Sequence, residues 1–371
     1  MWHYFPGMYM PSYQVNRALT QAHYGGGEFA EILEVASNIN PKDRSTINKA
    51  WLDMGDPVFD LAEGYEKDGN FVSARRTYLR AFNYLRSAEF FMKLGDPQKL
   101  ATYKKAREAF VRATKYFDEK VVNVEVPFEG SSLPGYLIKP VGVEKPPVIV
   151  FFGGLDSLAE ELYFGIGTHL MERGVAILAI DGPGQGAALR LNHIHSRHDF
   201  NVAGTAVYEY CVEHLKDEID VTSIGVGAVS MGGYMAARCA AFEPRFKVCM
   251  IFGAVWSYYE VWAGRPDAHP LADILQHIMG VDSMADARKK LEGYTLANGV
   301  AEKISCPTYI MHGGGDKQNA ANHAERLDAH LTCEHVLNIV PDGQRGAQHC
   351  QVDDFTPTFP MYDWIAKKIH E

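Results

Sequence analysis

The apolar residues of this 371-residue chain follow two different spacings. From about Ser12 to Asp118 they recur at three- and four-residue intervals, as in FVSARRTYLRAFNYLRSAEFFMKLGD. That interval places apolar side chains on one face of a helix. The pattern therefore predicts a helical domain over residues 1–118.

After residue 119 the apolar residues gather in short β-branched runs bounded by turn residues, which is typical of strands. Helical stretches lie between most of the later runs, as a parallel, doubly wound sheet requires. We expect the first two runs to form an antiparallel edge. The sequence thus predicts one α/β domain over residues 119–371. The runs span residues 121–128, 135–140, 146–154, 175–181, 223–230, 247–254, 307–314 and 335–341.

The alternation has one long interruption, between the sixth and seventh runs. Residues 256–305 contain helical patterns around LADILQHIM and MADARKKLE, and we interpret them as a cap insertion over the edge of the sheet. Aromatic residues at its start are suited to a flat ligand, and we expect Trp256, Tyr259 and Trp262 to contact substrate. Packing inside the core of the insertion is the alternative for these rings.

Composition excludes several classes of protein. Lys and Arg number 36 against 46 Asp and Glu, the net charge is −10, and no basic cluster is present, so nucleic acid is not an expected partner. The longest apolar run, residues 147–154, is much shorter than the roughly 20 residues of a membrane span, and the N-terminus lacks the pattern of a secretion signal. Six cysteines without CxxC pairs favour free thiols, so we expect a cytoplasmic protein.

The segment SIGVGAVSMGGYMAARCAAF predicts a nucleophile elbow at Ser230. A buried strand ends at Val229, and glycines open a helix directly after the serine, which is the context in which a hydroxyl is exposed at the top of a sheet. The usual pattern is GxSxG, and Ala228 replaces its first glycine. The alternative is a serine that caps the helix.

A serine hydroxyl needs a base, and the base needs an acid to orient it. Asp316 follows the predicted strand PTYIMHGG, and His349 follows the strand HVLNIVP, which gives the order Ser, Asp, His. We therefore predict a catalytic triad of Ser230, Asp316 and His349. The rival acids lie close to His349 in sequence: Asp342, Asp353 and Asp354.

Two backbone N–H groups are expected to bind the oxyanion. The N–H of Met231 lies at the start of the helix, and the loop after the third run offers Gly153, Gly154 and Leu155, of which we assign Leu155. Asp156 and Ser157 are expected to cap the helix predicted over residues 158–174.

Two other motifs resemble binding sites. DGPGQGAA, at residues 181–188, fits a dinucleotide fingerprint, but Pro183 lies in its turn, no helix is evident after it, and no acid-ending strand follows at the required distance. HIHSRHD, at residues 193–199, has the composition of a metal site, but no further His and Asp ligands support one. We expect no metal or cofactor, and His193 is a candidate substrate contact, with a solvated loop as the alternative.

The phrases YLRAFNYLRSAEFF, FFGGLDSLAEE, DGPGQG, SMGG and GAQHCQVDD together resemble the FrsA-like α/β hydrolases. The resemblance extends from about Asn70 to the C-terminus, and is strongest to the branch that contains 2,6-dihydroxypseudooxynicotine hydrolase and fungal hydrolases of polyketide pigments. It implies an α/β-hydrolase fold with an N-terminal helical lid, and it carries the triad and oxyanion roles onto the residues assigned above. Ala187 stands where this branch has an acidic residue.

The resemblance implies hydrolysis of a C–C bond beside a ketone, or of an ester, in an aromatic or polyketide-derived small molecule. A general carboxylesterase or thioesterase, cyclisation or retro-aldol chemistry on the same fold, and a non-catalytic binding protein are the alternatives. Large lidded members of this fold often pair, so a homodimer is also expected.

Overall fold

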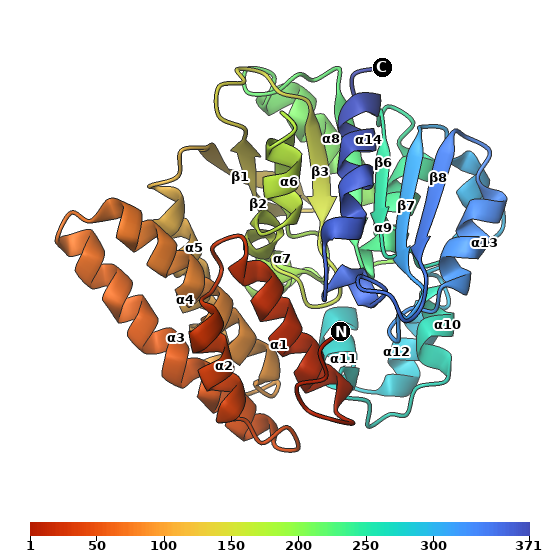
Figure 1. The fold of residues 1–371 in the computed structure, drawn as a ribbon. Coiled ribbons are helices and arrows are strands. Elements are labelled where there is room, and N and C mark those ends of the chain that lie inside the picture. The colour runs from red at the N-terminus through yellow and green to blue at the C-terminus, as the bar shows by residue number, and fades with distance from the viewer. The chain divides into compact units, whose positions relative to one another are not determined.

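The computed structural model describes residues 1–371 and divides into two compact units, Met1–Asp118 and Glu119–Glu371. The first unit is helical throughout (Figure 1). Its three longest helices pack in sequence, α3 on α4 and α4 on α5, and they bury Trp51, Tyr78 and Phe110. The helical pattern of residues 12–118 is thereby confirmed. The helices are α1 (Tyr9–Ala22), α2 (Phe29–Ser37), α3 (Arg44–Lys67), α4 (Phe71–Phe91) and α5 (Pro97–Thr114).

The second unit is built on an eight-stranded sheet in the order β1-β2-β4-β3-β5-β6-β7-β8. Strands β1 and β2 are antiparallel to each other, β2 is antiparallel to β4, and the other neighbours are parallel. All eight predicted strands are present, and the antiparallel edge is where it was expected. The strands are β1 (Lys120–Phe128), β2 (Ser131–Lys139), β3 (Val148–Phe152), β4 (Ala176–Ile180), β5 (Ile224–Val229), β6 (Cys249–Phe252), β7 (Thr308–Gly313) and β8 (His335–Val340).

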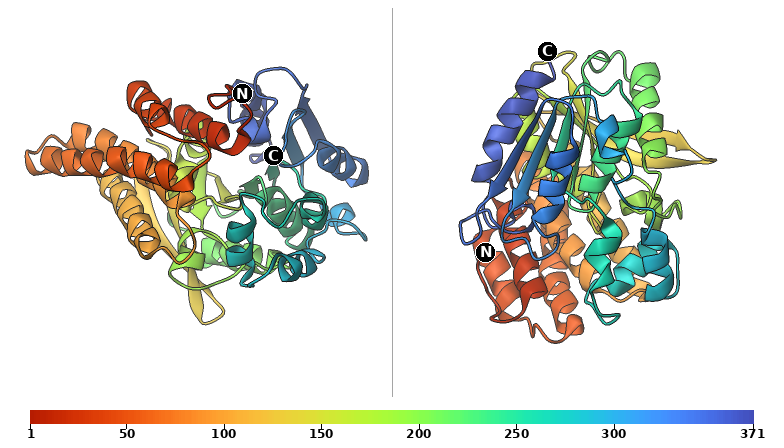
Figure 2. Two further views of the ribbon diagram at one scale, coloured as in Figure 1. Left: turned by 90° about the horizontal axis from the view of Figure 1, so that it is seen from below. Right: turned by 90° about the vertical axis from the view of Figure 1, so that its right-hand side faces the viewer.

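Helices cover both faces of this sheet (Figure 2). Helices α6 and α14 pack together over β4 and β7, while α8 and α9 pack together on the other face. The central strands are buried on both faces, which explains their nearly continuous apolar sequences. These helices are α6 (Ile166–Met171), α8 (Asn201–His214), α9 (Gly232–Phe242), α13 (Asn322–His330) and α14 (Phe359–Lys368).

The insertion between β6 and β7 is helical, as predicted. Helices α11 and α12 coincide with the LADILQHIM and MADARKKLE patterns, and α11 ends at Gly280 in a left-handed conformation. Ser283 caps α12 by accepting a hydrogen bond from the N–H of Asp286. The insertion contains α10 (Tyr258–Ala263), α11 (Ala272–Met279), α12 (Met284–Leu291) and the 3-10 helix η2 (Ala301–Lys303).

Two local expectations are wrong. Residues 158–174 do not form one helix: the 3-10 helix η1 (Ala159–Tyr163) and α6 are separated by Gly165, whose φ of +76° breaks the helical path. A short helix, α7 (Gly186–Arg190), does open after the glycine turn DGPGQG. Periodicity does not reveal either feature, because glycines with positive φ lie at each: Gly165 between η1 and α6, and Gly184 and Gly186 at the start of α7.

All six cysteines are free thiols. No helix combines the length and the apolar character that are needed to cross a membrane.

Candidate active site

Ser230 lies directly after β5, in the sharp turn that leads into α9. It has a φ of +64°, a left-handed conformation that is uncommon for a residue with a side chain. Its N–H donates to the carbonyl of Phe252 in β6 (2.8 Å), and its own carbonyl accepts from the N–H of Gly233 (2.8 Å). Sheet and helix together hold the turn, which projects the hydroxyl above the sheet.

Glycines allow the strand and the helix to approach each other at this turn. A Cβ at Gly232 would lie 2.7 Å from the Cβ of Ala228, and a Cβ at Gly233 would lie 2.1 Å from the carbonyl oxygen of Gly253. The methyl of Ala228 is accommodated because residue 232 has no side chain. The elbow therefore needs only one of the two glycines in the usual GxSxG pattern.

The structure brings the three residues of the predicted triad together. The Oγ of Ser230 lies 2.8 Å from the Nε2 of His349, and the Nδ1 of His349 lies 2.6 Å from the Oδ2 of Asp316. His349 follows β8 and Asp316 follows β7, so both reach the carboxyl edge of the sheet, where Ser230 also lies. The rival acids are engaged elsewhere: Asp342 accepts from Gly343, Asp353 from Gly346 and Asp354 from Thr356.

Burial and mutual charge together set the pKa values of His349 and Asp316. Burial disfavours the charged form of His349, but the negative charge of Asp316 and their hydrogen bond outweigh it, so the pKa of His349 lies well above its usual value. Burial likewise opposes ionisation of Asp316, but the charge of His349 and hydrogen bonds to the carboxylate lower its pKa. An imidazole that gains a proton is thus stabilised at this position.

The turn that contains Asp316 is itself held in place. The Oδ1 of Asp316 accepts hydrogen bonds from the N–H groups of Gln318 (2.7 Å) and Asn319 (2.9 Å). His312, which is fully buried in β7, accepts from the N–H of Ala254 at Nδ1 and therefore carries its proton on Nε2, which donates to the carbonyl of Asn319 (3.0 Å). Burial lowers the pKa of His312, so it remains neutral while it links this turn to the end of β6.

The loop after β3 lies against the nucleophile. A Cβ at Gly154 would lie 2.9 Å from the Cβ of Ser230. Ser157 does not cap the following helix, contrary to expectation, because its Oγ accepts from the N–H of Gly154 (3.0 Å). The amide of Gly154 is therefore occupied. The N–H groups of Leu155 and Met231 are not used in the chain's own hydrogen bonds.

Two of the three aromatic residues expected to contact substrate are buried. Trp256 is 3% exposed and its ring packs at an angle against His330 of α13, and Trp262 is fully buried beside His269 within the insertion. Tyr259 is 38% exposed. Only the contact of Trp262 is packing inside the insertion, and substrate contact by the three rings stays a prediction.

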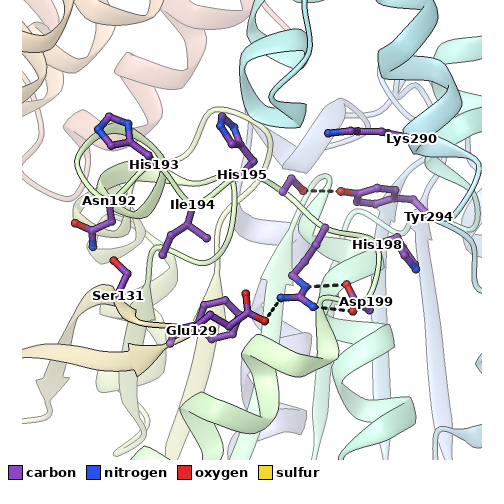
Figure 3. Close-up of a pocket in the computed structure, with 13 residues that line it drawn as sticks. Glu129, Ser131, Asn192, His193, Ile194, His195, His198, Asp199, Lys290 and Tyr294 are labelled. Carbon is purple, nitrogen blue, oxygen red and sulfur yellow. Dashed lines mark hydrogen bonds and ion pairs between the residues drawn. The ribbon is translucent and has the colours of Figure 1, made fainter.

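His193 is the remaining candidate substrate contact, and this role stays a prediction. His193 lies in the loop after α7 and lines a cavity of about 670 Å³, together with His195 and Lys290 (Figure 3). None of the triad residues lines this cavity. Arg197 beside it is held by Asp199 and by Glu129 of the β1–β2 turn. No group of three or more His, Cys, Asp or Glu side chains in the chain is arranged to hold a metal ion.

Comparison with known proteins identifies the family. The model of the family described as "Esterase FrsA-like" matches residues 58–296, more than half of the chain. The chain belongs to the FrsA-like family. This match confirms the resemblance that was drawn from the sequence motifs.

Curated relatives of this FrsA-like hydrolase are found in fungi. The alpha/beta hydrolase xenA of Xenoacremonium sinensis is 28% identical, with 92% of this chain and 89% of the relative covered. The hydrolase phmG of Phaeosphaeria nodorum is 31% identical, with 84% and 81% covered.

Solved structures share the fold. The crystal structure of 2,6-dihydroxy-pseudo-oxynicotine hydrolase has a TM-score of 0.81 at 23% identity and covers 95% of each chain. Wild-type AbyA5 has a TM-score of 0.68 at 18% identity, with 94% of this chain and 92% of the other covered. These likenesses confirm the α/β-hydrolase fold.

Sequence reasoning missed the residues that hold the site in place. His312 was a detectable signal, because it is a polar residue in the otherwise apolar strand TYIMHG, four positions before Asp316. Gln185, which bonds the Gly153 carbonyl, gave a weaker signal, as a long polar side chain in the glycine turn DGPGQG.

Proposed function

We propose that this FrsA-like protein is a serine-dependent hydrolase of an aromatic or polyketide-derived small molecule, and that it cleaves either a C–C bond next to a ketone or an ester bond. The observation that carries the proposal is the continuous chain of hydrogen bonds from Ser230 through His349 to Asp316, at 2.8 and 2.6 Å. This arrangement can remove the serine proton as the hydroxyl attacks a carbonyl carbon.

In the proposed mechanism His349 takes the proton of Ser230, and the serine oxygen adds to the substrate carbonyl. The N–H groups of Leu155 and Met231 hold the resulting oxyanion. Collapse of the tetrahedral intermediate breaks the bond to the leaving group, and the imidazolium of His349 gives its proton to that group. Water, deprotonated by His349, then releases the acid and restores Ser230.

The two bond types place different demands on the leaving group. An ester expels an alkoxide, whereas a ketone must expel a carbanion, which requires a ring or a neighbouring carbonyl to delocalise the charge. The likeness to 2,6-dihydroxy-pseudo-oxynicotine hydrolase supports the ketone, and the family description as an esterase supports the ester. Both are compatible with the same nucleophile and oxyanion groups.

The helical unit Met1–Asp118 and the insertion over residues 256–305 are proposed to serve as lid and cap. Such covers favour small substrates and exclude water during the reaction. The sequence resemblance supports a role in secondary metabolism or aromatic catabolism, and the free cysteines support a cytoplasmic location.

The test is mass spectrometry of the intact protein and its peptides after incubation with a small fluorophosphonate. We expect one adduct, on the peptide that contains Ser230, and no adduct in Ser230→Ala or His349→Ala. Ser37→Ala is the control, because the Ser37 hydroxyl donates only to the α2 backbone. Labelling that survives Ser230→Ala, or folded wild-type protein that is never labelled, would contradict the proposal.

A panel of nitrophenyl esters and aryl β-diketones separates the reaction types. Faster turnover of the β-diketones supports C–C cleavage, and turnover of the esters alone supports a carboxylesterase or thioesterase. Partial activity that remains in Ser230→Ala would favour cyclisation or retro-aldol chemistry on this fold.

A further inference from the structure

Gln185, in the glycine turn between β4 and α7, is buried, and both polar atoms of its side chain make hydrogen bonds. The residue is 2% exposed. Its Oε1 accepts from the N–H of Gly182 (3.0 Å), and its Nε2 donates to the carbonyl of Gly153 (2.7 Å) and contacts the Sδ of Met235 in α9 (3.4 Å). Only one orientation of the amide satisfies these contacts, because a donor faces Oε1 and an acceptor faces Nε2.

The carbonyl that Gln185 binds belongs to the peptide unit between Gly153 and Gly154. The N–H of the same planar unit donates to Ser157 (3.0 Å). Both polar ends of this peptide are therefore fixed, one by Gln185 and the other by Ser157. Since a peptide unit is rigid, fixing both ends sets its plane.

With this peptide fixed, the direction of the next N–H, that of Leu155, depends only on the φ and ψ of Gly154. Leu155 follows Gly154, and the Cα of Gly154 lies against Ser230, close enough that a Cβ would be 2.9 Å from the serine Cβ. The Gly153 carbonyl oxygen also packs on Gly232, where a Cβ would be 2.6 Å away. The loop is thus held between the glycine turn and the start of α9.

We propose that Gln185 is a positioning residue that holds the Gly153–Gly154 peptide, and through it the N–H of Leu155, in the orientation that binds the oxyanion. The inference rests on the proposed function, because it assumes that the loop after β3 binds the oxyanion through the N–H of Leu155. Gln185 touches no reacting atom. It acts only through the Gly153 carbonyl, and its other partners are Gly182 in its own turn and Met235 in α9.

The chemistry of this position is specific to a side-chain amide. Methionine has a similar length but neither accepts from Gly182 nor donates to Gly153. Glutamate keeps the shape, but when ionised it presents an oxygen to the Gly153 carbonyl oxygen, and the two repel each other. A protonated glutamate regains one donor. Because the Met and Glu variants differ in the hydrogen bonds they can make, comparing them separates the loss of these bonds from a general loss of folding.

The first test is steady-state hydrolysis of 4-nitrophenyl butyrate by Gln185→Met. We expect kcat to fall about 10- to 100-fold with KM within about twofold of wild type, because the oxyanion is bound only after attack. The low-field proton resonance of the His349–Asp316 hydrogen bond should be retained. Asn338→Leu is the control, because it removes a side-chain amide from β8 that bonds only Tyr309 (3.3 Å).

The second test is the pH dependence of Gln185→Glu relative to wild type. We expect the ratio of its kcat/KM to that of wild type to rise as the pH falls, since the protonated side chain can again donate to Gly153. Taking the ratio cancels the effect of His349, which titrates in both proteins.

A kcat for Gln185→Met within twofold of wild type, loss of the low-field resonance, or a pH-independent ratio for Gln185→Glu would overturn the inference. Failure of the proposed function is distinguishable, because wild-type protein would then show no turnover that depends on Ser230.

Discussion

At the scale of the residue, the backbone of Ser230 is strained and its surroundings hold it. A positive φ costs a residue with a side chain on the order of 1–3 kcal/mol. Here the hydrogen bond to Phe252 (2.8 Å) and the close packing of Gly154 and Gly253 maintain the conformation. Strain of this kind is found where a side chain must be presented to a ligand, which is the part proposed for Ser230.

The pH dependence of the proposed reaction is a prediction at this scale. Activity requires neutral His349, so the rate should fall as the pH drops through its pKa. The charge of Asp316 raises that pKa, and Asp316→Asn removes the charge. In this variant we expect the acid limb of the kcat/KM profile to move to lower pH and kcat to fall about 10⁴-fold.

Asp342→Asn is the control for this experiment, because the Asp342 carboxylate accepts only from its neighbour Gly343. An acid limb that stays in place or moves to higher pH in Asp316→Asn would show that Asp316 does not set the basicity of His349.

At the scale of the element, the close contact between α9 and the sheet depends on glycines, which have no side chain. Gly232 and Gly233 allow the start of the helix to lie against Ala228 and the backbone after β6. The same close approach orients the N–H of Met231 at the beginning of α9. Packing density at this contact therefore controls both stability and the proposed oxyanion site.

Gly233→Ala should be destabilising, because its Cβ would lie 2.1 Å from the Gly253 carbonyl oxygen and backbone would have to move. We expect a loss of about 1–3 kcal/mol in the free energy of unfolding, measured by urea titration. Gly264→Ala is the matched control: a Cβ there meets no atom within 4 Å, and its φ is −93°. Equal unfolding midpoints for the two variants would contradict the packing argument.

Asp181 joins two elements near the site. Its Oδ1 accepts from the N–H of Ala159 at the start of η1 (2.8 Å), and its Oδ2 accepts from the N–H of Ala187 in α7 (2.7 Å). Burial and the neighbouring charge of Glu160 raise the pKa of Asp181 to about 7. Ala187 is fully buried, so an acidic residue there would add a further charge beside Asp181.

The raised pKa gives a prediction about stability. In the unfolded chain the carboxyl titrates near 3.8, so between pH 3.8 and about 7 the folded protein binds more protons. The contribution of Asp181 to stability is therefore largest at low pH and declines as the pH rises to 7. We expect Asp181→Asn to lower the thermal midpoint more at pH 5 than at pH 8.

Exposed Asp60 supplies the control, as Asp60→Asn, in the same pair of buffers. A deficit of Asp181→Asn that is the same at pH 5 and at pH 8 would contradict the raised pKa, because it would show that the folded carboxyl is ionised at both pH values.

At the scale of the whole molecule, parallel strand order assembles the candidate site. Ser230, Asp316 and His349 are 119 residues apart at their extremes, yet they follow β5, β7 and β8, whose carboxyl ends share one edge of the sheet. The solved structure with a TM-score of 0.81 covers both compact units, so their combination in one chain is not peculiar to this protein.

Removal of metal ions by chelation tests whether the proposed hydrolysis depends on a metal. No cluster of His, Cys, Asp and Glu side chains in the chain is arranged to hold a metal, and the base proposed for Ser230 is His349, which lies 2.8 Å from its Oγ. We expect incubation with EDTA followed by desalting to leave Ser230-dependent ester hydrolysis within about 20% of the untreated rate. A loss of activity that Zn²⁺ or Mn²⁺ restores would contradict this expectation.

Much of the fold was predictable from local sequence. The helices of residues 9–114 and of the insertion have apolar residues at helical spacing, and the strands appear as short apolar runs bounded by turn residues. The triad was predictable in the same way, because each of its residues follows a predicted strand in the order Ser, Asp, His.

The sequence by itself determined which segments become strands and helices and which residue types stand at the ends of the strands, since these depend on neighbours a few positions away. Only the tertiary structure decided that Ser157 turns back to Gly154, that Gln185 holds the Gly153 carbonyl, and that Trp262 is buried in the insertion. Each of these outcomes depends on contacts with groups brought together by the fold or by a loop conformation, and periodicity carries no information about such contacts.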